Sequence, residues 1–179
     1  MKTILIGFIA LSLLFSCSEN KTSFANEEEL KAYVNDPDNG FIASDENGDF
    51  IMEAKLIPSI KEDKEPQLTV QVRLSRKDGG SVLDFGGVPK NEALEREGYL
   101  SFEVLNDVYF EDGDQLQPAI FHHYERNYGL KPSIDLFFRF NHFSPKDDVM
   151  FVYRDQLFNQ GMFRIPFNKA LFTSCHVQD

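Results

Sequence analysis

Residues 68–75 read LTVQVRLS, and this stretch decides the fold class. Four apolar side chains alternate in it with four polar ones: Leu68, Val70, Val72 and Leu74 against Thr69, Gln71, Arg73 and Ser75. Successive side chains of a strand point to opposite faces of a sheet. The alternation therefore predicts a strand with one buried face and one exposed face.

Further strands are expected on both sides of this stretch. Asn47-Gly48 is a strong hairpin signal and predicts that residues 41–46 pair with residues 49–57, up to Pro58. Later segments rich in Phe, Tyr, Val and Ile and bounded by Gly, Pro or Asp predict strands at 99–110, 118–127, 133–141, 148–154 and 162–169. We expect a mostly β fold, an antiparallel β-sandwich or a partly closed barrel with a short N-terminal helix.

That helix is expected from Asn26 to about Asn35. Asn26 has the properties of an N-cap, with Glu29 in the relation of a capping box, and the Asp-Pro and Asn-Gly of residues 36–40 end the helix. A second, short exposed helix is expected at residues 91–97 before Gly98, while residues 81–85 favour neither state.

The N-terminus has the layout of a lipoprotein signal. Lys2 precedes an apolar run of about twelve residues, shorter than the roughly twenty that a membrane-spanning helix needs. Residues 14–17, LFSC, resemble a bacterial lipobox, which predicts cleavage before Cys17 and acylation of its thiol; the alternative is an ordinary signal peptide that contains a cysteine. The expected organisation is a signal peptide at 1–16, a flexible tether with lipidated Cys17 at 17–25, and a single β-rich domain at 26–179.

Charge and cysteine content exclude several classes of protein. The chain carries 18 basic and 29 acidic residues, and loss of Lys2 with the signal takes the net charge from −11 to about −12. Nucleic acid is therefore a poor partner, and membrane attachment has to come from acyl chains. With Cys17 acylated, Cys175 has no disulfide partner. Eighteen Phe and no Trp favour a phenylalanine-packed core over an aromatic ligand platform.

Two acidic segments partly resemble calcium-binding loops. Asp45, Asn47 and Asp49 have suitable alternate spacing, but the sixth and twelfth positions hold Phe50 and Leu56 instead of Gly and Glu. A hairpin turn explains the same residues, and the acids of residues 111–114 fit a turn as well. We therefore predict no metal site in either segment.

The histidines and Cys175 do not form a motif for catalysis. His122 and His123 are neighbours on an expected strand and point to opposite faces, whereas zinc needs three or four ligands. His142 and His176 are distant in sequence, and adjacent Cys175 and His176 do not have the spacing of a thiol protease. No nucleophile elbow, phosphate loop or dinucleotide fingerprint is present, so we predict no catalytic residue, no cofactor and no enzyme.

Several segments, read together, resemble a family of small Bacteroidetes-type lipoproteins with a domain of unknown function. They are residues 30–41, 56–58, 68–75, 99–102 (YLSF), 126–130 (RNYGL) and 161–167 (GMFRIPF), and they span nearly the whole mature chain. The resemblance implies a β-rich domain in the cell envelope, at the outer membrane, and no catalytic residues. Residues 18–20 partly resemble an acidic signal for surface export, so a periplasmic and a surface-facing orientation both stay open.

Three hypotheses of function follow. The leading one is a membrane-anchored lipoprotein that presents its β domain to another envelope protein or to a ligand, with loops 112–117 and 128–132 at one end of the sandwich as the natural binding surface. A secreted or periplasmic hydrolase would require convergence of two or more of Asp107, His122, His123, Asp135 and His142 in one pocket. A self-assembling envelope protein would show an apolar patch or an unpaired edge strand.

Overall fold

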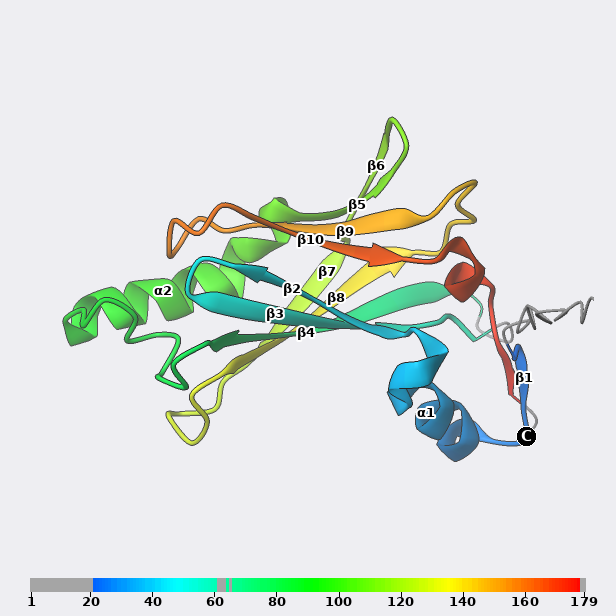
Figure 1. The fold of residues 1–179 in the computed structure, drawn as a ribbon, viewed down its shortest axis with the longest axis horizontal. Helices are drawn as coiled ribbons and strands as arrows, with labels where there is room; N and C mark the ends of the chain where they lie inside the picture. The colour runs from blue at the N-terminus through cyan, green and yellow to red at the C-terminus, as the bar shows by residue number, and fades with distance from the viewer. Residues whose placement is uncertain (1–20, 61–63, 65, 178–179) are drawn as a thin grey trace, which may run out of the picture.

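Two antiparallel β-sheets packed face to face form the body of the molecule (Figure 1). The computed structural model describes residues 21–60, 64 and 66–177. The five-stranded sheet has the order β2 (Ile42–Asn47), β3 (Phe50–Ile57), β4 (Gln67–Arg76), β8 (Ile134–Asn141) and β7 (Phe121–Glu125). The four-stranded sheet has the order β10 (Met162–Phe167), β9 (Val149–Arg154), β5 (Val108–Asp112) and β6 (Gln115–Pro118). The predicted antiparallel sandwich is confirmed, and the sheets do not close into a barrel.

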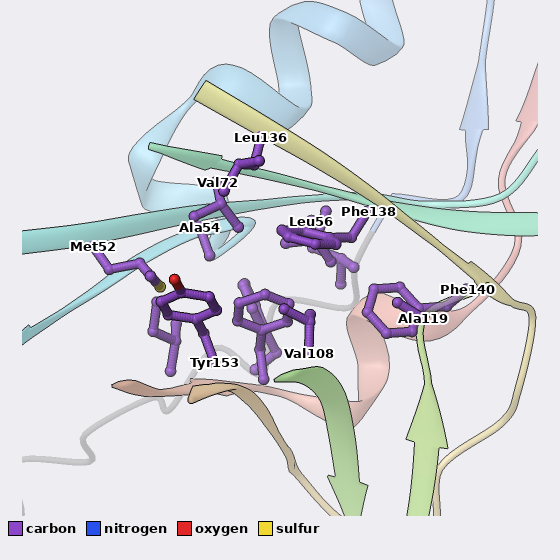
Figure 2. Packing of buried hydrophobic residues seen from close by; sticks show 14 of the residues in the cluster. Met52, Ala54, Leu56, Val72, Val108, Ala119, Leu136, Phe138, Phe140 and Tyr153 are labelled. Atoms are coloured by element: carbon purple, nitrogen blue, oxygen red, sulfur yellow. The ribbon is translucent and has the colours of Figure 1, made fainter. Parts of the chain in front are cut away.

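The core lies between the two sheets and is rich in phenylalanine. In β3 and β4 alternate residues are buried, and the register pairs Ala54 with Val72 and Leu56 with Val70 (Figure 2). Eleven of the described phenylalanines are buried, in agreement with the predicted phenylalanine core. Tyr153 also points into this core, where burial raises the pKa of its hydroxyl well above the ordinary value.

The hairpin between β2 and β3 turns one residue later than predicted. Asn47 pairs with Phe50, so the two turn residues are Gly48 and Asp49. Gly48 adopts the positive φ of 53° that this turn requires. Asn47 stays in the strand because its side-chain amide donates to the Met162 carbonyl oxygen at 3.0 Å.

The edges of β2 and β10 lie side by side and are sealed by side chains. The Asp45 carboxylate accepts a hydrogen bond from the Arg164 backbone N–H at 2.8 Å, and the Gln160 amide oxygen accepts one from the Asp49 N–H at 3.0 Å. Unpaired N–H groups of an edge strand are templates for aggregation, and here side-chain oxygens occupy them. This side of the sandwich is therefore closed to another strand.

The N-terminal helix forms where it was predicted. Helix α1 (Glu27–Asn35) is capped by the Asn26 side chain, which accepts from the Glu29 N–H at 2.9 Å, and it buries Leu30 and Val34. The Glu29 carboxylate bonds the Ala25 N–H, one residue before the position that a capping box predicts. The acids of the first turn also suit the positive end of the helix dipole.

The domain begins before Asn26. Strand β1 (Ser23–Phe24) pairs in parallel with β11 (His176–Val177), and Phe24 is buried. The end of the expected tether is thus part of the folded domain. The signal peptide, Cys17 and the first part of the tether lie outside the described residues.

Two of the predicted strands are wrong. In place of a strand from 99 to 110, helix α2 (Lys90–Phe102) continues through Gly98 and is followed by a 3-10 turn (Val104–Asp107) and β5. Arg96 and Leu100 are buried at a spacing of four, so packing of one face of α2 outweighs the β propensity of the aromatic residues. The expected helix at 91–97 is the first part of α2.

The expected strand from 118 to 127 is two strands in different sheets. Strand β6 ends at Pro118, and β7 starts at Phe121. Between them the Ala119 N–H bonds the Val108 carbonyl oxygen of one sheet at 3.3 Å, and the Ile120 N–H bonds the Arg139 carbonyl oxygen of the other at 2.8 Å. The chain therefore crosses from one sheet to the other at these two residues.

Residues 81–85, for which the sequence favours neither helix nor strand, form a loop.

In the part of the chain that the structure describes, no helix is long and apolar enough to cross a membrane.

Candidate functional site

The side of the sandwich opposite the β2–β10 seam is open. Here β6 and β7 are the outer strands of their sheets. Among the described strands, β7 pairs with β8 alone. The sequence of β7, FHHYE, contains neither proline nor lysine, the residues that commonly protect an edge strand. This open side therefore keeps a free strand edge, and the β2–β10 side does not.

Exposed apolar side chains gather along the same side. Of eight large hydrophobic residues exposed in the described chain, six lie on β6, on β7, at their junction, in the loop after β7 or at the end of α2: Phe102, Leu116, Ile120, Phe121, Tyr128 and Leu130. Isolated exposed apolar residues are common on protein surfaces, whereas a concentration of them marks an interaction site. The open side thus has the composition of a contact surface.

A hollow of about 510 Å³ runs along the free edge of β7. It is lined by residues 122–126, by Ser101 and Phe102 at the end of α2, and by Tyr128. Phe102 and Tyr128 are 76% and 86% exposed, so both rings are available to a partner. We call this hollow the edge pocket.

The two adjacent histidines point to different faces, as predicted. The His122 ring stacks on Phe138, with centroids 6.3 Å apart, and its Nε2 lies 3.1 Å from the Ser101 carbonyl oxygen. His123 lies beside Phe137 on the outer face of the five-stranded sheet. There it lines a second hollow of about 430 Å³ with Phe121 and Arg139, whose guanidinium lies 5.2 Å from the Phe121 ring centroid.

The backbone of Tyr128 is held in a conformation that residues other than glycine rarely adopt. Its φ is +50°, and the loop around it is fixed by Asn127. The Asn127 side chain accepts from the Gly129 N–H at 2.9 Å and donates to the carbonyl oxygens of Lys131 and Ser133 at 3.1 and 2.7 Å. A well-ordered loop thus keeps an exposed aromatic ring in a strained position, which is typical of functional sites.

The strain predicts that Tyr128→Asn stabilises the protein. Asparagine tolerates positive φ better than tyrosine, and the exposed Tyr128 ring contributes nothing to the core. We expect the free energy of unfolding in urea to rise by up to about 1 kcal/mol. A decrease of more than about 1 kcal/mol in the free energy of unfolding would show that the Tyr128 ring supports the fold.

The residues named for a hydrolase do not converge. Asp107 accepts a hydrogen bond from the Tyr99 hydroxyl at 2.5 Å, and Asp135 accepts one from Arg73 Nε at 2.8 Å. His142 Nδ1 lies 3.0 Å from Ser59 Oγ, and partial burial lowers the pKa of His142. Of the named set, only the neighbours His122 and His123 line the edge pocket. The two carboxylates of that set, Asp107 and Asp135, do not line it.

The other candidate positions have structural roles. Asp45 and Asn47 bond the backbone of β10, and Glu111 pairs with Arg164. Within residues 21–60, 64 and 66–177, no three His, Cys, Asp or Glu side chains are placed to hold a metal ion. Cys175 is buried beside Ile60, and burial raises the pKa of its thiol to about 11, away from the range of a reactive thiolate.

The two loops expected to bind at one end of the sandwich lie apart. The β5–β6 turn and the loop of residues 126–132 are at opposite ends of the run formed by β6 and β7 (Figure 1). The sequence therefore pointed to the Tyr128 loop and, as hydrolase candidates, to His122 and His123, but not to Ser101 and Phe102 of the edge pocket. Phe102 was missed because it was assigned to a strand.

Comparisons with protein-family models, with curated proteins and with solved structures found no match to this chain.

Proposed function

We propose that the chain is an envelope lipoprotein, held at a membrane by acyl chains on Cys17, whose β-sandwich binds another envelope protein. The observation that carries the proposal is the contrast between the two sides of the sandwich. One side is sealed by Asp45 and Gln160, and the other keeps a free strand edge beside exposed Phe102 and Tyr128. Interfaces are enriched in exposed aromatic residues of this kind.

The position of the N-terminal segment supports this role. Strand β1 and helix α1 lie at one end of the long axis, and the loop that carries Tyr128 lies at the other (Figure 1). A domain held through the segment that precedes β1 would present this loop away from its anchor. The lipobox and the short apolar run of the sequence support the anchor itself.

The hydrolase alternative has less support. Its carboxylates and histidines are spread over separate regions, with Asp107 engaged by Tyr99 and Asp135 by Arg73 and Lys131. Nucleic acid stays an unfavourable partner because the net charge is −11. A protein partner at the outer membrane is the proposal that these observations favour.

Cys17→Ala tests the anchor. We expect wild-type protein in the membrane fraction, with an intact mass that includes two or more acyl chains. The Cys17→Ala variant is expected in the soluble fraction without added lipid mass, because each buried methylene contributes about 0.8 kcal/mol to membrane binding. Equal partition of the two proteins would contradict lipid anchoring.

Tyr128→Asn tests the partner surface. We expect a protein that co-purifies with the wild type from gently solubilised host membranes to be lost from this variant. The variant keeps the fold, so its loss of a partner would not result from unfolding. Leu94→Ser is the matched control, since Leu94 is exposed on α2 but does not line the edge pocket. Equal recovery with all three proteins would contradict a contact at the Tyr128 loop.

A further inference from the structure

We propose that the partner supplies an extended segment that pairs with β7 as an added strand of the five-stranded sheet. This inference rests on the proposed function, because it specifies how the open side binds. It starts from the shape of the edge pocket, which is lined by five consecutive residues, 122–126. A hollow that follows consecutive residues of an outer strand runs along its free edge, where backbone N–H and C=O groups point outward.

The other outer strands are less suited to such pairing. Strands β2 and β10 face each other, and the Asp45 carboxylate occupies the Arg164 N–H. Strand β6 has four residues and ends at Pro118, which has no N–H to donate. Strand β7 contains no proline, is not sealed by a neighbouring strand and has a hollow beside it. Its five residues would pair with a segment of about five residues, roughly 17 Å long.

The side chains around the edge pocket specify the segment further. Phe102 and Tyr128 offer two exposed rings, so we expect apolar residues at alternate positions of the segment. Arg126 donates to Ser101 Oγ at 3.2 Å, and no described carboxylate lies within ion-pair distance of it. The Arg126 guanidinium at the rim can therefore pair with a carboxylate, so we expect one Asp or Glu near one end of the segment, while Glu125 in the same lining disfavours further acids.

A segment of another protein fits this surface better than a second copy of the chain. The guanidinium of Arg126 favours an acidic extended segment of a different protein through a local ion pair. The net charge of −11 opposes a second copy and an acidic partner alike, so this local pairing decides between them. Self-association through β7 is therefore an outcome that would contradict the proposal.

The test uses short peptides as ligands of the full chain and of three single-residue variants. The full chain, purified in mild detergent, is used to select binders from a library of random short peptides displayed on phage. We expect acidic peptides with alternating apolar residues, bound by wild type and by the Leu94→Ser control but about tenfold or more weakly by Tyr128→Asn and Arg126→Gln. Failure to select any peptide that depends on Tyr128 and Arg126 would overturn the inference.

Backbone methylation of the best peptide then tests strand pairing directly. Each N-methyl group removes one N–H donor, and in an added strand only alternate N–H groups face the neighbouring strand. We expect N-methylation at alternate positions to weaken binding about tenfold or more, with small effects at the positions between them. Strand addition would be excluded if N-methylation weakened binding at every position, at no position, or with the period of a helix.

The two proposals fail in different ways. If an envelope protein co-purifies in a Tyr128-dependent manner but the methylation scan shows no period of two, strand addition is wrong and the partner surface stands. If the purified chain forms dimers that Tyr128→Asn or Arg126→Gln abolishes, the occupant of the edge pocket is a second copy, and the inference of an acidic segment from another protein is wrong.

Discussion

Replacement of Phe110 by alanine is expected to lower the free energy of unfolding by about 4 kcal/mol. Phe110 is fully buried on β5. Its ring centroid lies between 4.6 and 6.5 Å from those of five other rings: Phe140, Phe143, Phe151, Phe167 and Phe172. These rings come from both sheets and from the segments near the C-terminus. The alanine variant therefore leaves a cavity at the point where the layers meet, and urea denaturation would measure the loss.

Phe121→Ala is the matched control for this prediction. Phe121 is a half-exposed phenylalanine on β7, so its removal creates no cavity. We expect its free energy of unfolding to stay within about 0.5 kcal/mol of the wild-type value, as for most surface substitutions. Similar losses in the two variants would show that the Phe110 cluster does not hold the sheets together.

Arg96→Met is expected to lower the free energy of unfolding by about 3 kcal/mol. Arg96 on α2 is 7% exposed, and its Nη1 donates to the carbonyl oxygens of Leu83 and Phe85 at 2.8 Å each. Its guanidinium also lies 5.0 Å from the Phe158 ring centroid. Methionine fills much of the volume but leaves two carbonyl oxygens without this donor, so the loop of residues 81–88 loses its attachment to α2.

Glu92→Gln separates the ion pair of Arg96 from its other contacts. Glu92 Oε1 lies 3.0 Å from Arg96 Nη2, at an exposed position one helical turn away. Because the Glu92 side chain is 45% exposed, water screens this pair, and we expect urea denaturation to show a loss of less than about 1 kcal/mol in the free energy of unfolding. If Glu92→Gln were as destabilising as Arg96→Met, the ion pair and not the loop carbonyls would account for the role of Arg96.

Local patterns were sufficient to predict much of the fold. The alternation in residues 68–75 predicted β4, and Asn26 with Glu29 predicted α1, because in both places local preference and burial agree. The predictions failed where long-range packing decides. The aromatic side chains of Tyr99 and Phe102 favour a strand, yet this segment is helical, with Arg96 and Leu100 buried on one face of α2.

The site was less predictable than the fold. The Asn-Tyr-Gly of residues 127–129 indicated a loop, but the positive φ of Tyr128 depends on the hydrogen bonds of Asn127 across the turn. The crossing between sheets at Ala119 and Ile120 leaves no periodic signal, since each residue bonds a different sheet. Because this crossing could not be predicted, the sequence did not show that β7 is the outer strand of its sheet and has a free edge.

Photo-crosslinking in the native host tests the partner surface most directly. A photoreactive amino acid replaces Tyr128, Phe102 or, as the control on the same helix, Leu94 in the full acylated chain. We expect the same defined protein adduct from positions 128 and 102 and none from position 94, because only the first two residues line the edge pocket. Adducts of equal yield at all three positions, or none at 128 and 102, would contradict the claim that this side of the sandwich binds an envelope partner.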